Sequence, residues 1–143
     1  MNIAGLRLAR LSIHQLQTDD APTLYKQIAA LQYDVGVIPA FAPLPRTVNP
    51  AIPTTGYEDV KRVALARLLL EDVPSIQVDW SLYGPKLAQV ALTMGADDVD
   101  AVAAFEVENL GHRRSAVEEI TRNIRAASLE PVERDALFKR ILV

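Results

Sequence analysis

Residues 75–100 decide the fold, and their sequence is Ser75-Ile-Gln-Val-Asp-Trp-Ser-Leu-Tyr-Gly-Pro-Lys-Leu-Ala-Gln-Val-Ala-Leu-Thr-Met-Gly-Ala-Asp-Asp-Val-Asp100. The first six residues predict a strand. Pro85 fits the first turn of a helix, because its φ is already helical and its missing N–H is not needed there. Apolar residues follow at helical spacing, and Gly95 is a natural C-terminal stop. A further strand is expected over residues 98–105, which completes a strand–helix–strand unit.

The same alternation begins at the N-terminus. Residues 6–13 alternate apolar and polar side chains for part of their length, which predicts a strand, with a helix as the alternative. Asp19 or Asp20 then lies just before Pro22, and an Asp N-cap with proline in the first turn favours a helix start. We therefore expect a helix from about residue 20 to 32.

The middle of the chain contains a strand and a long loop. Residues 35–41 are short, partly β-branched and bounded by turn residues, which predicts a buried strand that ends at Pro39 or lies at a sheet edge. Residues 42–53 contain four prolines and are neither helix nor central strand. Loops of this length inside compact domains are often functional.

Two capping boxes mark further helices. Thr55 and Glu58 have the spacing in which each side chain bonds the other residue's backbone N–H, so a helix is expected from there to about Asp72. Ser115 and Glu118 have the same spacing, and apolar residues at helical intervals follow them. These signals predict the fourth and the eighth regular segments of an alternating α/β chain.

Asp135 is expected to cap a last short helix that ends near Leu142. The order of strands and helices predicts an α/β fold of parallel βαβ units in one domain, residues 1–143. Functional loops in such sheets follow the carboxyl ends of the strands, here after Ala40, after Asp79 and after Phe105.

Composition excludes several classes of function. The 143 residues have a formal net charge of −3, so no basic surface for nucleic acid or for an anionic membrane is expected. No apolar run approaches the ~20 residues that span a bilayer, and no signal peptide is evident, so we expect a cytoplasmic protein. The chain has no cysteine, which excludes disulfides and a cysteine-ligated iron–sulfur cluster within it.

Three residues near the expected strand ends are candidate ligand contacts. Arg46 could clamp a carboxylate with its forked guanidinium, or could be a solvated loop charge. Asp79 could bind a hydroxyl group or act as an acid or base, or could cap the next helix. Trp80 could offer an apolar face to a ligand, or could fill the core.

Other polar clusters favour simpler interpretations. Asp97, Asp98 and Asp100 could ligate Mg²⁺ or Ca²⁺, but a turn before a strand explains them better, so no metal site is predicted. His14 and His112 lie far apart, and no nucleophile motif accompanies either of them. No catalytic residue is therefore assigned. The glycine-rich phosphate-binding motifs are also missing from the sequence.

The segment 80–100 resembles the C-terminal part of the radical-SAM enzymes of the futalosine menaquinone route. The runs 84–92 and 95–100 are most similar to the aminofutalosine synthase family, and less so to cyclic dehypoxanthinyl futalosine synthases and deazaflavin-cofactor synthase subunits. Further pieces resemble neighbouring parts of the same family, at residues 37–43, 63–78 and 124–135. The resemblance extends from about residue 30 to the end of the chain.

This resemblance implies that the chain forms the last strands and helices of a TIM-like barrel, here as a small standalone α/β domain. Enzymes of the family join an enolpyruvyl benzoate to the adenosyl part of S-adenosylmethionine with a radical made at a [4Fe–4S] cluster. The three cluster cysteines are missing here, so the cofactors would be bound by an N-terminal half that this chain lacks. The expected substrate contacts are Arg46 as carboxylate clamp, Trp80 as stacking wall, Asp79 as hydroxyl acceptor, and Glu106 after the last strand.

Two hypotheses follow. In the first, the chain is the C-terminal portion of such a transferase, inactive alone, and a separate N-terminal chain supplies the cluster. In the second, it is a free-standing, non-catalytic α/β module that forms a homo-oligomer or binds a protein partner. Both predict association, because a barrel segment exposes sheet edges and faces that need cover.

Overall fold

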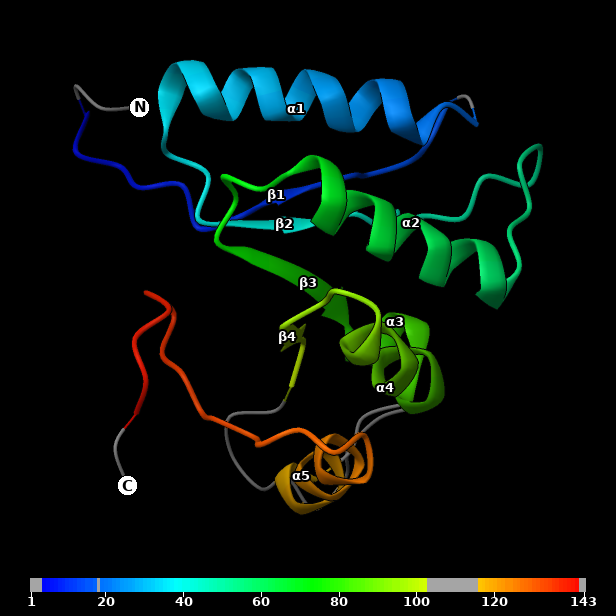
Figure 1. Cartoon of the computed structure of the whole chain (residues 1–143), viewed down its shortest axis with the longest axis vertical. Helices are drawn as coiled ribbons and strands as arrows, with labels where there is room; N and C mark the ends of the chain where they lie inside the picture. The colour runs from blue at the N-terminus through cyan, green and yellow to red at the C-terminus, as the bar shows by residue number, and fades with distance from the viewer. Residues whose placement is uncertain (1–3, 18, 103–115, 142–143) are drawn as a thin grey trace.

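The computed structural model describes residues 4–17, 19–102 and 116–141. It contains a four-stranded parallel sheet in which the strands lie side by side in chain order (Figure 1). The strands are β1 (Leu11–Ser12), β2 (Ala40–Ala42), β3 (Ser75–Asp79) and β4 (Asp98–Asp100). Helices alternate with them, so the predicted α/β fold of parallel βαβ units is confirmed.

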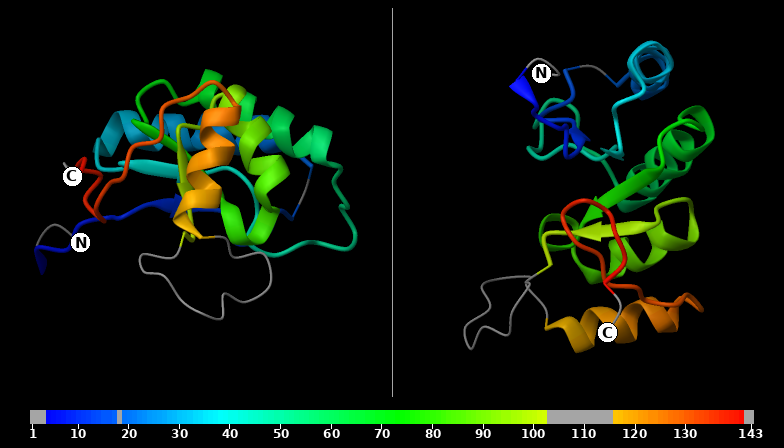
Figure 2. Two further views of the ribbon diagram at one scale, coloured as in Figure 1. Left: turned by 90° about the horizontal axis from the view of Figure 1, so that it is seen from below. Right: turned by 90° about the vertical axis from the view of Figure 1, so that its left-hand side faces the viewer.

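The helices form a single layer. They are α1 (Ala21–Val35), α2 (Gly56–Leu69), α3 (Trp80–Tyr83), α4 (Pro85–Thr93) and α5 (Val117–Ala126). Two views at right angles show α1, α2 and α4 on one side of the sheet, with α5 continuing the row beyond α4 (Figure 2). The opposite face of the sheet carries no helix in the described part of the chain. This one-sided arrangement is that of a barrel segment.

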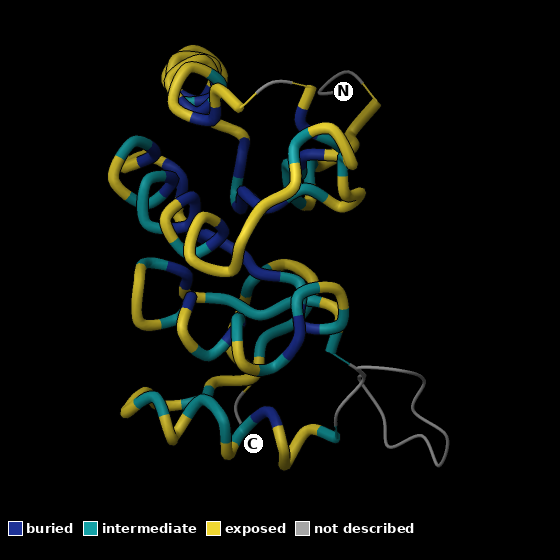
Figure 3. Tube along the Cα trace, turned by 90° about the vertical axis from the view of Figure 1, so that its right-hand side faces the viewer, coloured by how far each residue is buried: buried dark blue, intermediate teal, exposed yellow. Residues whose placement is uncertain are grey.

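The alternation of side chains along β3 explains which face the helices cover. Ile76 and Val78 are buried in one cluster with the apolar residues of α2 and α4. Successive side chains of a strand point to opposite faces, so Ser75, Gln77 and Asp79 point away from the helices. Figure 3 shows the buried positions concentrated between the helix layer and the sheet. The second face of the sheet is therefore polar.

Helix α1 begins as predicted but ends later. Asp20 is its N-cap and accepts a hydrogen bond from the Thr23 N–H at 3.1 Å. The helix runs to Val35 and stops at Gly36, whose left-handed φ of 60° suits glycine. The predicted strand over residues 35–41 is therefore wrong in its first half.

A buried glutamine explains why the link between α1 and β2 is not a strand. The Gln32 Oε1 atom accepts a hydrogen bond from the Ile38 N–H at 2.9 Å, and its Nε2 donates to the Asp72 carbonyl at 2.9 Å. These bonds occupy the Ile38 N–H that a strand would use for its ladder. β2 starts at Ala40, so Pro39 precedes the strand and does not end it.

The first strand is much shorter than the predicted range of 6–13. Only Leu11 and Ser12 pair with β2, opposite Phe41 and Ala42. β2 itself has three residues, so it offers β1 few backbone partners. The length of β1 is therefore limited by the short strand with which it pairs, and not by its own sequence pattern.

The remaining boundaries follow from local caps. Thr55 and Glu58 form the predicted capping box, and α2 ends at Leu69. β3 ends at Asp79, because its carboxylate accepts a hydrogen bond from the Leu82 N–H at 2.8 Å and starts the one-turn helix α3. That helix was not predicted, and Trp80 belongs to it and not to the strand.

The C-terminal segment is not the expected helix. The Asp135 Oδ1 atom accepts hydrogen bonds from the N–H groups of Leu137, at 2.8 Å, and Lys139, at 2.9 Å. Phe138 has a left-handed φ of 62°, which a helix cannot contain, and Arg134 pairs with Arg140 in an antiparallel bridge. Asp135 thus organises a tight turn.

The expected last strand and the expected cap of α5 lie partly outside the described residues. The last strand was expected over 98–105, and β4 spans Asp98–Asp100, while residues 103–105 are outside the described part. The same holds for Ser115, the expected cap of α5.

The sheet is strongly curved. Arg10, next to β1, forms an ion pair with Asp100 at the end of β4, although these strands lie at opposite edges of the sheet. In a flat sheet the two edges would be roughly 14 Å apart, since neighbouring strands are spaced ~4.8 Å. The side chains can meet because the sheet bends toward its polar face, as a barrel wall does.

Among the glycines that the structure describes, Gly95, after α4, packs most tightly against a neighbouring helix. Gly95 has a φ of +122°, and a Cβ there would lie 2.8 Å from the Cβ of Arg67. We predict that Gly95→Ala lowers the free energy of unfolding by about 2 kcal/mol or more, measured by urea titration. Gly56→Ala is the control: its Cβ would meet only the Leu87 side chain, at 3.8 Å. Equal effects of the two substitutions would contradict this account.

Candidate functional site

A pocket lies at the carboxyl ends of the strands, on the polar face of the sheet. It collects side chains from the ends of all four strands and from the loops that follow them. The lining residues are Arg10, Ser12, Ala42, Leu44, Arg46, Gln77, Asp79, Leu82, Tyr83 and Asp100. Parallel α/β barrels bind their ligands at the carboxyl ends of their strands, which is where this pocket lies.

The floor of the pocket is a row of side chains across the sheet. Ser12 is opposite Ala42 in the register of β1 and β2, and Gln77 is opposite Asp98 in that of β3 and β4. The Gln77 side chain is 2% exposed, and its Nε2 donates a hydrogen bond to the Asp98 carboxylate at 2.7 Å. Its Oε1 atom is buried and has no hydrogen-bond partner in the described residues.

Two guanidinium groups lie at the pocket, and they differ in their partners. The half-buried Arg10 side chain is paired with Asp100. Arg46 is exposed, and within the described ranges its guanidinium has no hydrogen bond or ion pair. With this ion pair closed, the water-accessible volume of the pocket is about 10 Å³, which is room for one water molecule.

The loop that carries Arg46 is fixed by its backbone. The Arg46 N–H donates to the Ile13 carbonyl at 2.9 Å, and the Thr47 N–H donates to the His14 carbonyl at 2.8 Å. Two tyrosine hydroxyls hold the same loop: Tyr25 donates to the Pro43 carbonyl and Tyr83 to the Pro45 carbonyl. The expected proline-rich loop is thus an ordered wall of the pocket.

Burial raises the pKa of both tyrosine hydroxyls, at Tyr25 and at Tyr83. Each hydroxyl therefore keeps its proton and remains a hydrogen-bond donor throughout the neutral range. The loop carbonyls that accept these bonds would otherwise be partly buried without a donor.

The four sequence-predicted contacts have different positions. Arg46 and Asp79 both line the pocket, as the strand-end argument predicts. Trp80 is completely buried and belongs to the apolar core beside the pocket. Glu106 lies outside the described residues. The substrate-binding roles given to these side chains remain predictions.

Asp79 has a structural task as well. Its Oδ1 atom accepts the hydrogen bonds that cap α3, from the Leu82 N–H and from the Ser81 hydroxyl at 2.9 Å. Capping and ligand binding were alternatives in the sequence, and the structure shows the cap. The carboxylate is held in place at the pocket wall by these bonds.

Sequence reasoning missed Arg10, Gln77 and Asp100. Arg10 and Ser12 fall on the same face of the expected first strand, so period-two alternation was a usable signal. Gln77 is the polar residue between two apolar ones in β3, which is also visible in the sequence. The meeting of Arg10 with Asp100 depends on sheet curvature, for which the sequence had no local signal.

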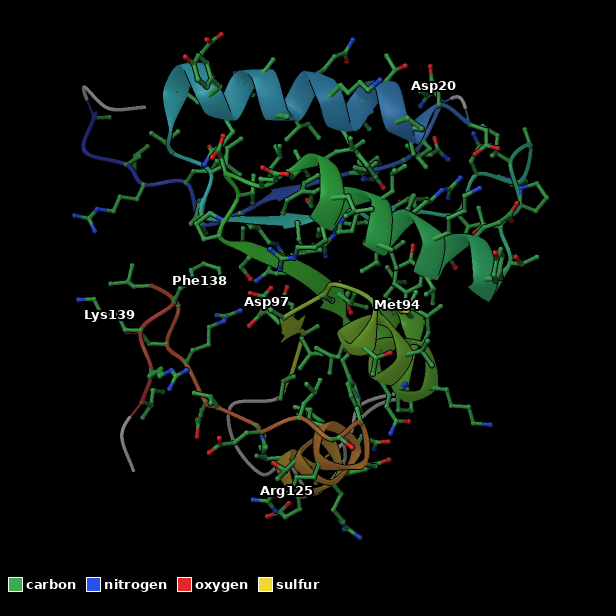
Figure 4. The ribbon with its side chains drawn as sticks, in the orientation of Figure 1. Asp20, Met94, Asp97, Arg125, Phe138 and Lys139 are labelled. Atoms are coloured by element: carbon green, nitrogen blue, oxygen red, sulfur yellow. The ribbon has the colours of Figure 1, made fainter. Side chains whose placement is uncertain are left out.

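The three aspartates near β4 do not gather around one point. Asp97 accepts hydrogen bonds from the Ser75 hydroxyl and the Ile76 N–H, whereas Asp98 pairs with Arg134. Figure 4 shows Asp97 at the end of the sheet where the C-terminal turn with Phe138 and Lys139 also lies. Among the residues that the structure describes, no group of His, Cys, Asp or Glu side chains could hold a metal ion.

None of the helices in the described part of the chain combines the length and apolar character of a membrane-spanning helix.

Comparisons with known proteins identify a family and two groups of relatives. The family model of the CofH/MqnC C-terminal region matches residues 44–141. An aminodeoxyfutalosine synthase of Thermus thermophilus is 39% identical over 95 residues, which are 63% of this chain and 26% of the relative. A protein of the same name from Streptomyces coelicolor is 35% identical over 91 residues, 59% of this chain and 24% of the relative.

A second group of relatives has a different name. A 5-amino-6-(D-ribitylamino)uracil–L-tyrosine 4-hydroxyphenyl transferase of Methanococcoides burtonii is 38% identical over 94 residues, 61% of this chain and 26% of the relative. The chain therefore spans about a quarter of the length of each of these three relatives.

The hydroxyl of Tyr83 gives a test of how the loop is held. Tyr83→Phe leaves the Pro45 carbonyl without its donor, so we predict that the free energy of unfolding falls by about 1 kcal/mol. Tyr57→Phe is the control, because Tyr57 is 80% exposed. Both variants are compared with the parent chain in urea. A Tyr83 variant as stable as the Tyr57 variant would show that the bond does not hold the loop.

A buried carboxylate on α2 predicts a pH effect. Burial raises the pKa of Asp59, although a hydrogen bond to Thr54 and the charge of Arg62 act in the opposite direction. Folding therefore favours the protonated form, and ionised Asp59 lowers stability at neutral pH. This cost disappears as the pH falls below the ordinary pKa of 3.8.

We predict that Asp59→Asn raises the free energy of unfolding at pH 7, by an amount of the order of 1 kcal/mol, and changes it much less near pH 3.5. Urea titrations at both pH values measure the difference, with the exposed Asp34→Asn as control. A gain that is the same at both pH values would not arise from the ionisation of Asp59.

Proposed function

The chain belongs to the family of the CofH/MqnC C-terminal region, and we propose that it supplies the substrate-binding wall of a radical-SAM transferase most like aminofutalosine synthase. In this proposal the reaction adds the adenosyl part of S-adenosylmethionine to an enolpyruvyl benzoate in menaquinone biosynthesis. The family match supports the kinship. The choice within the family follows the resemblance of residues 84–92 and 95–100, because the identities of 35–39% to two aminodeoxyfutalosine synthases and of 38% to a hydroxyphenyl transferase do not separate the two groups.

One observation carries the proposal: no helix of residues 4–17, 19–102 or 116–141 lies over the polar face of the sheet, whose pocket is at the carboxyl ends of four parallel strands. A barrel enzyme places its substrate at this end, against side chains from several strands. The curvature shown by the Arg10–Asp100 pair fits a wall of such a barrel.

The residues present do not fit the cofactors of the family. A [4Fe–4S] cluster is held by cysteine thiolates, and the sequence contains no cysteine. The cluster and S-adenosylmethionine are therefore assigned to a cluster-bearing part that these 143 residues do not include. That part is the proposed partner, and it would cover the open polar face.

The proposal gives this chain binding tasks only. Arg46 would hold a substrate carboxylate, since its guanidinium is exposed at the pocket. Asp79 would accept a hydrogen bond from a substrate hydroxyl, since its capping bonds fix its position. Trp80, buried in the core, would support the wall by packing. We include a cytoplasmic location, because a chain without cysteine has no disulfide of the kind that small secreted domains use.

A split-enzyme experiment tests this function. The N-terminal part of the Thermus thermophilus relative, cut before the region that matches this chain, is purified with its cluster and mixed with the 143-residue chain. We expect a one-to-one complex and formation of the adenosine adduct, measured by mass spectrometry. Arg46→Gln in the chain should lower the rate at limiting substrate by about tenfold or more, as expected for a lost charge-assisted bond.

The relative's own C-terminal part is the positive control. If it restores activity while this chain neither binds the N-terminal part nor yields product, the transferase proposal is wrong. A self-associating chain in that case would favour the second hypothesis, a non-catalytic module that forms homo-oligomers.

A further inference from the structure

The pocket contains two cationic side chains on separate segments. Arg10 is the residue just before β1, and Arg46 lies in the loop after β2. Both side chains line the same pocket. Guanidinium groups bind carboxylates through two parallel hydrogen bonds, which makes them the preferred residues for such ligands. Arg10 already holds the carboxylate of Asp100, while in the described part of the chain Arg46 holds none.

An independent feature lies at the pocket floor. Gln77 is 2% exposed, and its Oε1 atom has no donor among the described residues. The orientation of this amide is fixed, because its Nε2 donates to Asp98 at 2.7 Å, and a reversed amide would place two acceptors against each other. A buried acceptor without a donor is costly, so this site favours a ligand that brings an N–H or O–H group.

We propose that the pocket binds a carboxylate with a neighbouring hydroxyl or amino group, and that this carboxylate replaces Asp100 on Arg10. The inference goes beyond the function proposed above, because an enolpyruvyl benzoate has no hydroxyl or amino group beside its carboxylates. Arg46 holds the second side of the ligand carboxylate. The neighbouring hydroxyl or amino group donates to the Gln77 Oε1 atom.

The Arg10–Asp100 pair is suited to such an exchange. Both side chains are 28% exposed, so water already reaches them, and ion pairs of this kind contribute little net stability. Replacing one carboxylate by another keeps Arg10 paired throughout. The exchange also makes room, because the space beneath the closed pair holds only one water.

Release of Asp100 is compatible with its place in the chain. It is the last residue of β4, and Ala101 after it has a left-handed φ of 60°, so the strand ends there. Its ladder partner is Asp79, whose carboxylate already accepts the capping bonds of α3. Asp100 can therefore turn toward water without breaking the sheet.

Three matched probes test the ligand chemistry: acetate, glycolate and glycine. They share a carboxylate and differ in having no neighbouring donor, a hydroxyl or an ammonium group. Each is titrated into the ¹⁵N-labelled 143-residue chain at constant ionic strength, and dissociation constants come from arginine side-chain and backbone shifts. We expect glycolate, glycine or both to bind at least about threefold tighter than acetate, and the better of the two identifies the donor.

Variants separate the roles of the residues. Arg10→Gln and Arg46→Gln should each weaken binding by about fivefold or more, whereas Asp100→Asn should strengthen it, because it removes the competing carboxylate. Gln77→Met should abolish the preference over acetate. Arg7→Gln removes a charge from the same segment at an exposed position outside the pocket, and should change nothing.

The amide spectrum of each variant shows whether it folds. If Arg10→Gln does not fold, Arg10→Lys keeps the charge but loses the forked geometry, and it should also weaken binding. The proposal is overturned if Asp100→Asn leaves the affinity unchanged, or if Arg7→Gln weakens binding as much as Arg10→Gln does. The first result would make the ion pair purely structural, and the second would mean non-specific charge attraction.

These outcomes are independent of the split-enzyme experiment. Carboxylate binding without adduct formation would leave the site standing and remove the transferase function. Adduct formation without any effect of the Arg10 and Asp100 variants would support the transferase function and remove the proposed site.

Discussion

The order of the strands is the constraint on which the rest of this structure depends. Crossover connections between parallel strands are right-handed in nearly all proteins, so a sheet whose spatial order follows the chain receives its helices on one face only. Here the order is β1-β2-β3-β4, and the helices form one layer. The βαβ connections among the described residues therefore leave the other face without a helix. Its side chains are accordingly polar, and its carboxyl end forms the pocket.

Local signals predicted the parts of the fold that local bonds determine. The starts of α1 and α2 were predictable because Asp20 and Thr55 bond to N–H groups within the next turn. The errors lie where a distant partner decides. Gln32 holds the segment before β2 through bonds to Ile38 and to Asp72, forty positions away, and no periodicity in residues 35–41 indicates that.

The residues of the candidate site also differ in whether local sequence signals could predict them. Arg46 and Asp79 were predictable because each follows a strand, and strand ends meet at one edge of a parallel sheet. Arg10 and Gln77 required the register and the curvature, which become visible only when the strands are assembled. Membership of the family does not by itself give this chain the family's chemistry. The family match covers most of the chain, yet the sequence contains no cysteine to ligate an iron–sulfur cluster, so we propose only binding tasks for this chain.

β4 has three residues, and few backbone bonds hold so short a strand in place. Ion pairs at its two ends favour one alignment: both sides of the Arg134 guanidinium bind Asp98, at 2.7 Å each, and Arg10 binds Asp100. A slip by one position would turn both carboxylates into the apolar layer and bring Val99 to the polar face. The N-terminal and C-terminal segments of the chain thus act together as a check on strand alignment. Assembly with neighbouring strands would then start from an edge whose alignment is already determined.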